Sequence, residues 1–236
     1  IHLAEGQYEI EYTLGKHNLR PAEYLHNIGF FEPNVLAAHS VLLSRRELDI
    51  LRDDDVAVAH CPQPAYTGIG PCRVPEMLDR GISIGLGTDG ALTGSLDLLQ
   101  KMWFSFTGQI TNYGTPYYDR GATTSYQVFR MATRGGAEAL RWSDEIGSIE
   151  PGKQADILLF HADHLDALPA YDVTYTVTDC LNASALDTVI IAGRPVMREG
   201  KLLTINEEDL KRRVLRRKTA IIDNFLEKSG QKRRGY

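Results

Sequence analysis

Val56-Ala57-Val58-Ala59-His60 is the stretch of sequence that decides the fold, because it is a short apolar run that ends in a histidine. The same kind of run occurs before it, in Val35-Leu36-Ala37-Ala38-His39, and after it, in Ile82-Ser83-Ile84-Gly85-Leu86. Such runs, bounded by turn residues and without strict alternation, are typical of strands buried on both faces of a parallel sheet.

Helical patterns lie between these predicted strands. Ser44 and Glu47 are three residues apart and form a capping box, which predicts the start of a helix. A second helix is predicted over residues 74–80, with Gly81 as its stop. The β-α-β-α order implies right-handed parallel crossovers, and therefore an α/β barrel or a doubly wound sheet.

The second half of the chain changes character. Residues 111–124 are rich in Gly, Tyr, Thr and Pro and predict a loop, whereas residues 125–140 return to helical spacing. Residues 155–160 predict a strand, and residues 188–191 and 195–197 flank a tight turn, which predicts a hairpin. The pattern indicates a small β-unit appended to the α/β region.

The C-terminal segment predicts an amphipathic helix. Apolar residues recur there at helical spacing between clusters of Lys and Arg: Leu210, Val214, Ile221, Ile222 and Phe225. We interpret its basic side as a solvated helix face.

Composition limits the class of protein. The chain has 236 residues, enough to bury a substantial core, with 43% hydrophobic and 24% charged residues. The net charge of −5 argues against a dedicated nucleic-acid binder, and no apolar run approaches the length of a membrane span. The three cysteines form no C-x-x-C pair, which favours a reducing, cytoplasmic setting.

Polar residues follow the predicted strands at their carboxyl ends: His2 with Glu5, His39, His60 and Asp89. This end carries the active site in α/β barrels, and His and Asp are suited to zinc. Taken singly, each residue also has a structural explanation. A histidine there can be a hydrogen-bonded core residue, and Asp89 can form a turn beside Gly90.

Four segments resemble the second half of the amidohydrolase superfamily, in chain order: His2-Leu3-Ala4-Glu5, Ala37-Ala38-His39, His60-Cys61-Pro62 and Leu86-Gly87-Thr88-Asp89-Gly90. They are most similar to its deaminase and chlorohydrolase branch, which includes adenosylhomocysteine/methylthioadenosine deaminases and guanine deaminase. The likeness runs from the first residue to about Leu226.

The resemblance implies three regions. Residues 1–145 would be strands five to eight of a (β/α)8 TIM barrel, that is, its C-terminal half. Residues 146–203 would be part of a small β-sandwich, and residues 204–236 a C-terminal amphipathic helix and basic tail.

The resemblance also implies roles for individual residues. His2 and Asp89 would bind one divalent metal ion, for which we expect zinc, with iron as the alternative. Glu5 would shuttle protons between the activated water and a ring nitrogen of the substrate. His39 would lie near the water and the reacting carbon, and Asp89 would also take a proton from the water.

Three further residues are candidates for the substrate pocket. His60 is expected in its wall, and Tyr66 and Trp103 are candidates for stacking on a flat heterocycle, with core packing as the alternative for Trp103. The stretch Gln63-Pro64-Ala65-Tyr66 departs from the Ser-Asn that is usual in adenosine-type deaminases. The substrate is therefore not fixed as an adenosine derivative.

No His-x-His pair occurs in the sequence, although the family has one on its first barrel strand. We therefore expect this chain to be the C-terminal portion of a protein of roughly 400 to 480 residues, the size of a full barrel with a sandwich. The missing N-terminal half, in the same gene product or in a companion chain, would supply the pair. We also expect a homo-oligomer.

The predicted function is a metal-dependent hydrolase that attacks a C–N bond of a nitrogen heterocycle with activated water. Deamination with release of ammonia is favoured, because Glu5 suits proton delivery to both nitrogens. The alternatives are a triazine-type chlorohydrolase and a cyclic amide hydrolase. A non-catalytic scaffold that kept the barrel and lost the metal is the alternative of a different class.

Overall fold

The computed structural model describes residues 1–31, 34–92 and 94–229. A four-stranded parallel sheet forms its first half, in the order β1-β2-β3-β4. The strands are β1 (His2–Leu3), β2 (Leu36–His39), β3 (Ala57–His60) and β4 (Ile84–Leu86). The predicted parallel strands are confirmed, and so is the α/β class.

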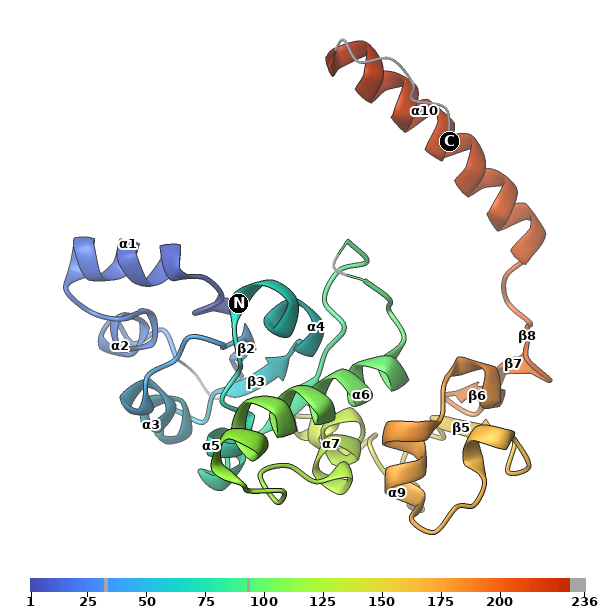
Figure 1. Ribbon diagram of the computed structural model, residues 1–236, viewed down its shortest axis with the longest axis horizontal. Helices are drawn as coiled ribbons and strands as arrows, with labels where there is room; N and C mark the ends of the chain where they lie inside the picture. Colours follow the sequence, from blue (N-terminus) through green and yellow to red (C-terminus); the bar gives the residue numbers. More distant parts are fainter. Residues whose placement is uncertain (32–33, 93, 230–236) are drawn as a thin grey trace.

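Helices connect these strands and cover the sheet (Figure 1). The connections after β1 and β2 are α1 (Gln7–His17), α2 (Pro21–Asn27) and α3 (Arg45–Asp53). The connection after β3 contains α4 (Pro62–Pro64), the π-helix η1 (Ala65–Ile69) and α5 (Val74–Asp79). After β4 come α6 (Leu98–Gln109), the π-helix η2 (Ile110–Gly114), η3 (Thr115–Tyr117), α7 (Ser125–Ala132) and α8 (Arg134–Ala139).

The predicted capping box at the start of α3 is confirmed. The Glu47 amide donates to Ser44 Oγ at 3.2 Å, and the Ser44 amide donates to Glu47 Oε2 at 2.8 Å. The Glu47 carboxylate is fully buried and also accepts from Arg20 Nε at 2.6 Å and from the Ala22 amide at 3.1 Å. One buried carboxylate therefore ties the start of α2 to the start of α3.

Two sequence predictions were wrong in detail. The segment 111–124 begins as helix, because η2 and η3 continue from α6, and Asn112 Nδ2 donates to the Gly108 carbonyl at 2.7 Å. The single helix predicted over residues 125–140 is two helices. It breaks at Thr133 (φ −127°, ψ −101°), whose hydroxyl donates to the Phe129 carbonyl at 2.8 Å and competes with the helical pattern.

The second half contains a four-stranded antiparallel sheet in the order β5-β6-β7-β8. Its strands are β5 (Ile157–Phe160), β6 (Leu186–Ile191), β7 (Arg194–Arg198) and β8 (Lys201–Leu202), and between β5 and β6 lie η4 (Leu165–Ala167), α9 (Val173–Tyr175), η5 (Thr176–Cys180) and η6 (Ala183–Ala185). The predicted hairpin is confirmed. Its turn residues Ala192 (φ 48°) and Gly193 (φ 76°) are both left-handed, as tight hairpin turns require.

The predicted C-terminal helix is confirmed as α10 (Glu207–Ser229), which stands apart from both sheets in Figure 1. Its apolar side chains, such as Val214 and Phe225, are exposed. Acidic residues in its first turn interact favourably with the helix dipole. Lys211 Nζ lies 3.0 Å from Glu208 Oε1 and forms a salt bridge along the helix. No helix in the described ranges combines the length and hydrophobicity needed to cross a membrane.

Candidate active site

Three predicted site residues lie together at the carboxyl edge of the parallel sheet. His2 Nδ1 lies 3.2 Å from Glu5 Oε2, and His39 Nε2 lies 3.9 Å from Glu5 Oε1. The two imidazole rings are 4.6 Å apart between centroids, at an angle of 70°. One oxygen of the Glu5 carboxylate is therefore within hydrogen-bond distance of His2, and the other lies near His39.

The side chains of this cluster are of the types that bind divalent metal ions. One ligand atom from each of His2, Glu5 and His39 lies within 4.8 Å of the other two. Ligands of a tetrahedral zinc ion are about 3.4 Å apart, given metal–ligand distances of about 2.1 Å. His39 is buried, and its Nδ1 has no hydrogen-bond partner among the described residues. His2 is open to solvent, with 65% of its side chain exposed.

Unusual backbone conformations place these side chains. Ala4 (φ 47°) and His39 (φ 67°) both take left-handed conformations, which are rare for residues other than glycine. Such strained positions cluster at functional sites, where the surrounding structure holds them. Here they turn the chain at the ends of β1 and β2, where the cluster lies.

Glu9 holds the loop that carries Glu5, and sequence reasoning missed it. Its carboxylate accepts from the backbone amides of Ala4 at 3.2 Å, Glu5 at 2.6 Å and Gly6 at 3.4 Å. The available signal was a glutamate three residues after Gly6, the N-cap of α1.

His60 lies at the end of β3, next to the cluster in strand order. It is fully buried, and neither ring nitrogen has a hydrogen-bond partner within the described chain. Burial lowers the pKa of His60 to about 3, and nearby His39 contributes in the same direction. The ring is therefore neutral at pH 7, and it lies 6.1 Å from the Tyr66 ring in an edge-on arrangement.

Asp89 does not join the cluster of His2, Glu5 and His39 in the described residues. It follows β4 with a left-handed backbone (φ 57°), and its Oδ1 accepts from the Gly90 amide at 2.6 Å. Its charge, together with burial as the larger cause, raises the pKa of the Cys61 thiol to about 11. Three strand spacings separate β1 from β4, which is about 14 Å along the edge of the sheet.

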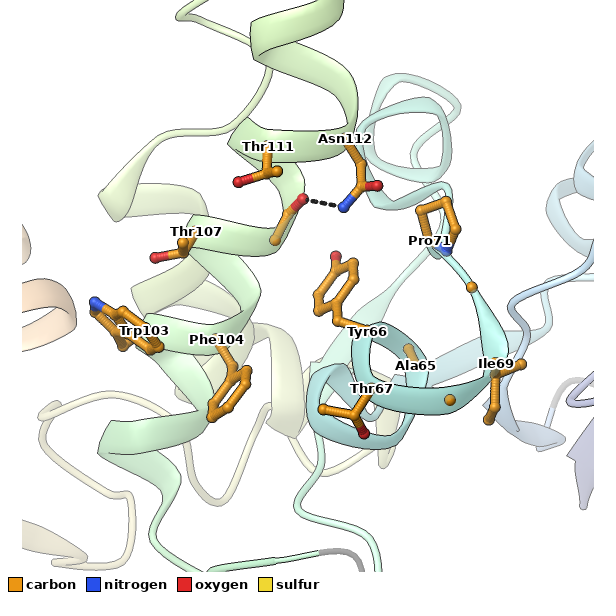
Figure 2. A pocket seen from close by; sticks show the side chains of 13 residues that line it. Ala65, Tyr66, Thr67, Ile69, Pro71, Trp103, Phe104, Thr107, Thr111 and Asn112 are labelled. Atoms are coloured by element: carbon orange, nitrogen blue, oxygen red, sulfur yellow. Dashed lines mark hydrogen bonds between the residues drawn. The ribbon is translucent and has the colours of Figure 1, made fainter.

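Tyr66 and Trp103 line a cavity of about 530 Å³ between η1 and α6 (Figure 2). Trp103 is 46% exposed, so it is not a core residue in the described structure. The Tyr66 hydroxyl accepts from Gln109 Nε2, and its ring packs on Gly108, where an added Cβ would overlap the ring. Both η1 and η2 contribute lining residues, and π-helices are frequent at functional sites.

A buried polar stripe on α6 was also missed. Lys101, Ser105 and Gln109 recur every fourth residue and are all fully buried. Lys101 Nζ donates to Gln63 Oε1, and burial lowers the pKa of Lys101 against the opposing effect of Asp97 and Asp89. The signal available from the sequence was this four-residue polar spacing inside a largely apolar helix.

Comparison with known proteins gives three findings. A family model described as the amidohydrolase family matches residues 1–196. The 5'-deoxyadenosine deaminase of Methanobrevibacter smithii is 37% identical over 215 residues, which is 89% of this chain and 48% of that protein. The 5-methylthioadenosine/S-adenosylhomocysteine deaminase of Pelotomaculum thermopropionicum is 38% identical over 216 residues, with the same shares of both chains.

A similar solved structure is that of an adenosine deaminase from Xanthomonas campestris with bound zinc. The TM-score is 0.88 at 25% sequence identity, over 94% of this chain and 50% of that one. The chain thus spans about half the length of the curated relatives that it matches. The family resemblance of the strand-end segments is confirmed, and the chain belongs to the amidohydrolase family.

Proposed function

We propose that this chain provides half of the active site of a metal-dependent hydrolase that deaminates a nitrogen heterocycle. The observation that carries the proposal is the Glu5 carboxylate, which lies within 3.2 Å of His2 and 3.9 Å of His39 at the carboxyl edge of a parallel sheet. A carboxylate beside two imidazoles combines a metal-binding position with a proton carrier.

His2 and Asp89 would hold one divalent ion, zinc by the nature of the donors and iron as the alternative, and Glu5 and His39 would lie beside the ion without binding it. When bound, the ion supplies Lewis acidity, which lowers the pKa of water towards neutrality. A zinc-bound adenosine deaminase is among the similar structures, which supports this assignment.

Glu5 would move both protons that the reaction requires. Water adds its oxygen to the ring carbon that bears the amino group, and the bond from that carbon to the amino nitrogen breaks. One proton of the water passes through Glu5 to the adjacent ring nitrogen. The second passes to the amino group, which leaves as ammonia. His39 would orient the Glu5 carboxylate and the attacking water, and Asp89 would accept a proton from the water before Glu5 passes it on.

The parallel sheet would be strands five to eight of a (β/α)8 barrel, within residues 1–145. Residues 146–203 would form part of a β-sandwich, and residues 204–236 the C-terminal helix and tail. His2 and Asp89 follow the two outer strands of the sheet, β1 and β4. In a closed barrel the side chains at this rim point towards a common axis, so residues from non-adjacent strands converge there. The rest of the barrel would contribute a His-x-His pair.

The substrate would be a heterocycle that carries an exocyclic amine. Relatives that deaminate 5'-deoxyadenosine and 5-methylthioadenosine by name support a purine nucleoside as the first compound class to test. His60, Tyr66 and Trp103 would form the pocket beside the reacting carbon. Tyr66 lies in the segment, residues 63–66, that departs from the Ser-Asn usual in adenosine-type deaminases. Purines, pyrimidines and triazines therefore belong in the same screen.

The test is Glu5→Gln in the full-length, metal-loaded protein, assayed by ammonia release and ultraviolet change across that screen. Losing a positioned acid–base group should lower the rate roughly 10²- to 10⁴-fold, with metal content unchanged. Glu11→Gln, an exposed residue of α1, is the matched control and should retain full activity. Turnover of Glu5→Gln close to that of the control would remove Glu5 from the mechanism.

A further inference from the structure

A second cavity, of about 680 Å³, lies among the loops that follow β1, β2 and β3. It shares no lining residue with the cluster of His2, Glu5 and His39, nor does His60 line it. Three arginines line it: Arg20, Arg45 and Arg73. A cavity with several guanidinium groups is suited to carboxylate or phosphate ligands, which accept paired hydrogen bonds from them.

Two of these arginines are held in place from the same loop. Arg20 donates from Nη2 to the Leu42 carbonyl and from Nε to Glu47 at 2.6 Å. Arg73 donates from Nη1 to the next carbonyl, Leu43, at 3.3 Å and from Nε to Glu76 at 2.8 Å. Side chains already fixed in this way lose little conformational freedom when they bind a ligand.

The lining carries an excess of positive charge. Glu76 is the one carboxylate among the described residues that line the cavity. Its carboxylate oxygens form salt bridges with Arg73 Nε at 2.8 Å and Arg45 Nε at 3.4 Å. Outside the cavity, they also pair with Arg80 Nη1 at 3.9 Å. Glu47, the partner of Arg20, is fully buried and does not line the cavity. The lining therefore contains three arginines and one carboxylate, and Glu47 pairs with Arg20 from outside the lining.

Apart from Gln7, the rest of the lining is apolar and aromatic. Ile10, Val41 and Pro71 form part of the wall, and the Tyr113 hydroxyl donates to the Pro71 carbonyl at 3.4 Å. Tyr117 is 75% exposed and presents a flat surface to a ligand. These groups fit a flat, apolar body attached to the anionic group.

We propose that this cavity is a binding site for a small molecule that carries a phosphate or carboxylate group on a flat, apolar body. The site goes beyond the proposed deaminase chemistry and does not depend on it, because its residues are not those of the catalytic cluster.

Isothermal titration of the full-length protein with phenyl phosphate tests the proposal, with benzoate as the carboxylate probe and benzyl alcohol as the neutral one. A chelator in the buffer keeps metal at the cluster from binding the probes, and no turnover is required. Saturable binding of phenyl phosphate, benzoate or both, weakened by added salt, is expected, and benzyl alcohol should not bind.

Arg73→Met should weaken the binding of the anionic probe by about tenfold or more, because a charge-assisted hydrogen-bond donor is lost. Arg80→Met is the matched control, since Arg80 also pairs with Glu76 but does not line the cavity; its effect should stay below about twofold. Arg45→Met gives a second variant that should fold, because the Arg45 side chain is 77% exposed. Absence of saturable binding, equal affinity for benzyl alcohol, or equal losses in Arg73→Met and Arg80→Met would overturn the proposal.

Discussion

Replacing Glu47 by alanine should destabilise the chain more than any substitution of an exposed ion pair. The buried carboxylate accepts from Arg20 Nε at 2.6 Å, the Ala22 amide at 3.1 Å and the Ser44 amide at 2.8 Å. Its removal leaves Arg20 without its ionic partner. It also leaves the Ala22 and Ser44 amides without their acceptor, and the Ala22 amide is buried.

The magnitude follows from these contacts. Breaking a buried ion pair by removing one partner costs about 3–5 kcal/mol, and each buried donor left without an acceptor costs about 1–3 kcal/mol. The two contributions overlap, and Arg20 keeps its bond to the Leu42 carbonyl, so we expect a net loss of about 4 kcal/mol. For a chain of this size that corresponds to a fall in Tm of about 8–16 °C.

Thermal unfolding followed by circular dichroism measures this shift, with urea unfolding as the check on free energy. Asp53→Ala is the control, because Asp53 pairs with Arg52 at 2.8 Å at the surface and should leave Tm unchanged. Glu47→Gln keeps the shape of the side chain and one acceptor oxygen, so its Tm should lie between those of Glu47→Ala and Asp53→Ala. Equal values of Tm for Glu47→Ala and Asp53→Ala would refute the reasoning.

Three further outcomes are expected. Glu9→Gln should lower turnover without loss of metal, because the three amides around Glu5 lose a charged acceptor; unchanged kcat would contradict this. Gly108→Ala should destabilise the fold and raise KM by displacing the Tyr66 ring, whereas Gly15→Ala, with open space around it, should do neither. His60, with a folded pKa of about 3 against 6.5 unfolded, binds a proton only in the unfolded chain between those pH values. Stability should therefore fall as pH drops below 6.5, by about 2 kcal/mol at pH 5, and urea unfolding of His60→Asn should show a correspondingly smaller fall.

Local signals predicted much of the fold. The strands ending at His39 and His60 were visible because a short apolar run followed by a polar residue is a local pattern. The cap at Ser44 and the turn at Gly193 were visible for the same reason. The meeting of His2, Glu5 and His39 also followed from the sequence, since parallel neighbouring strands end at a common edge.

The remaining features depend on partners that lie far away in the sequence. Glu47 had the pattern of an exposed capping residue, and its burial depends on Arg20, in another helix connection. The burial of the polar stripe on α6 depends on its hydrogen bonds to Gln63 and Tyr66, which lie before β4 in the sequence. The position of Asp89 depends on the curvature of the sheet, which no local pattern encodes.

Helix α10 has a consequence for the lifetime of the protein. It stands apart from both sheets and carries closely spaced lysines and arginines, the residues after which trypsin-like proteases cut. Its amides should exchange with solvent like those of an isolated helix, and local unfolding there costs little free energy. Proteolysis should therefore begin in α10 and leave His2, Glu5 and His39 intact, so that the segment cut first is not the one that holds the candidate site residues.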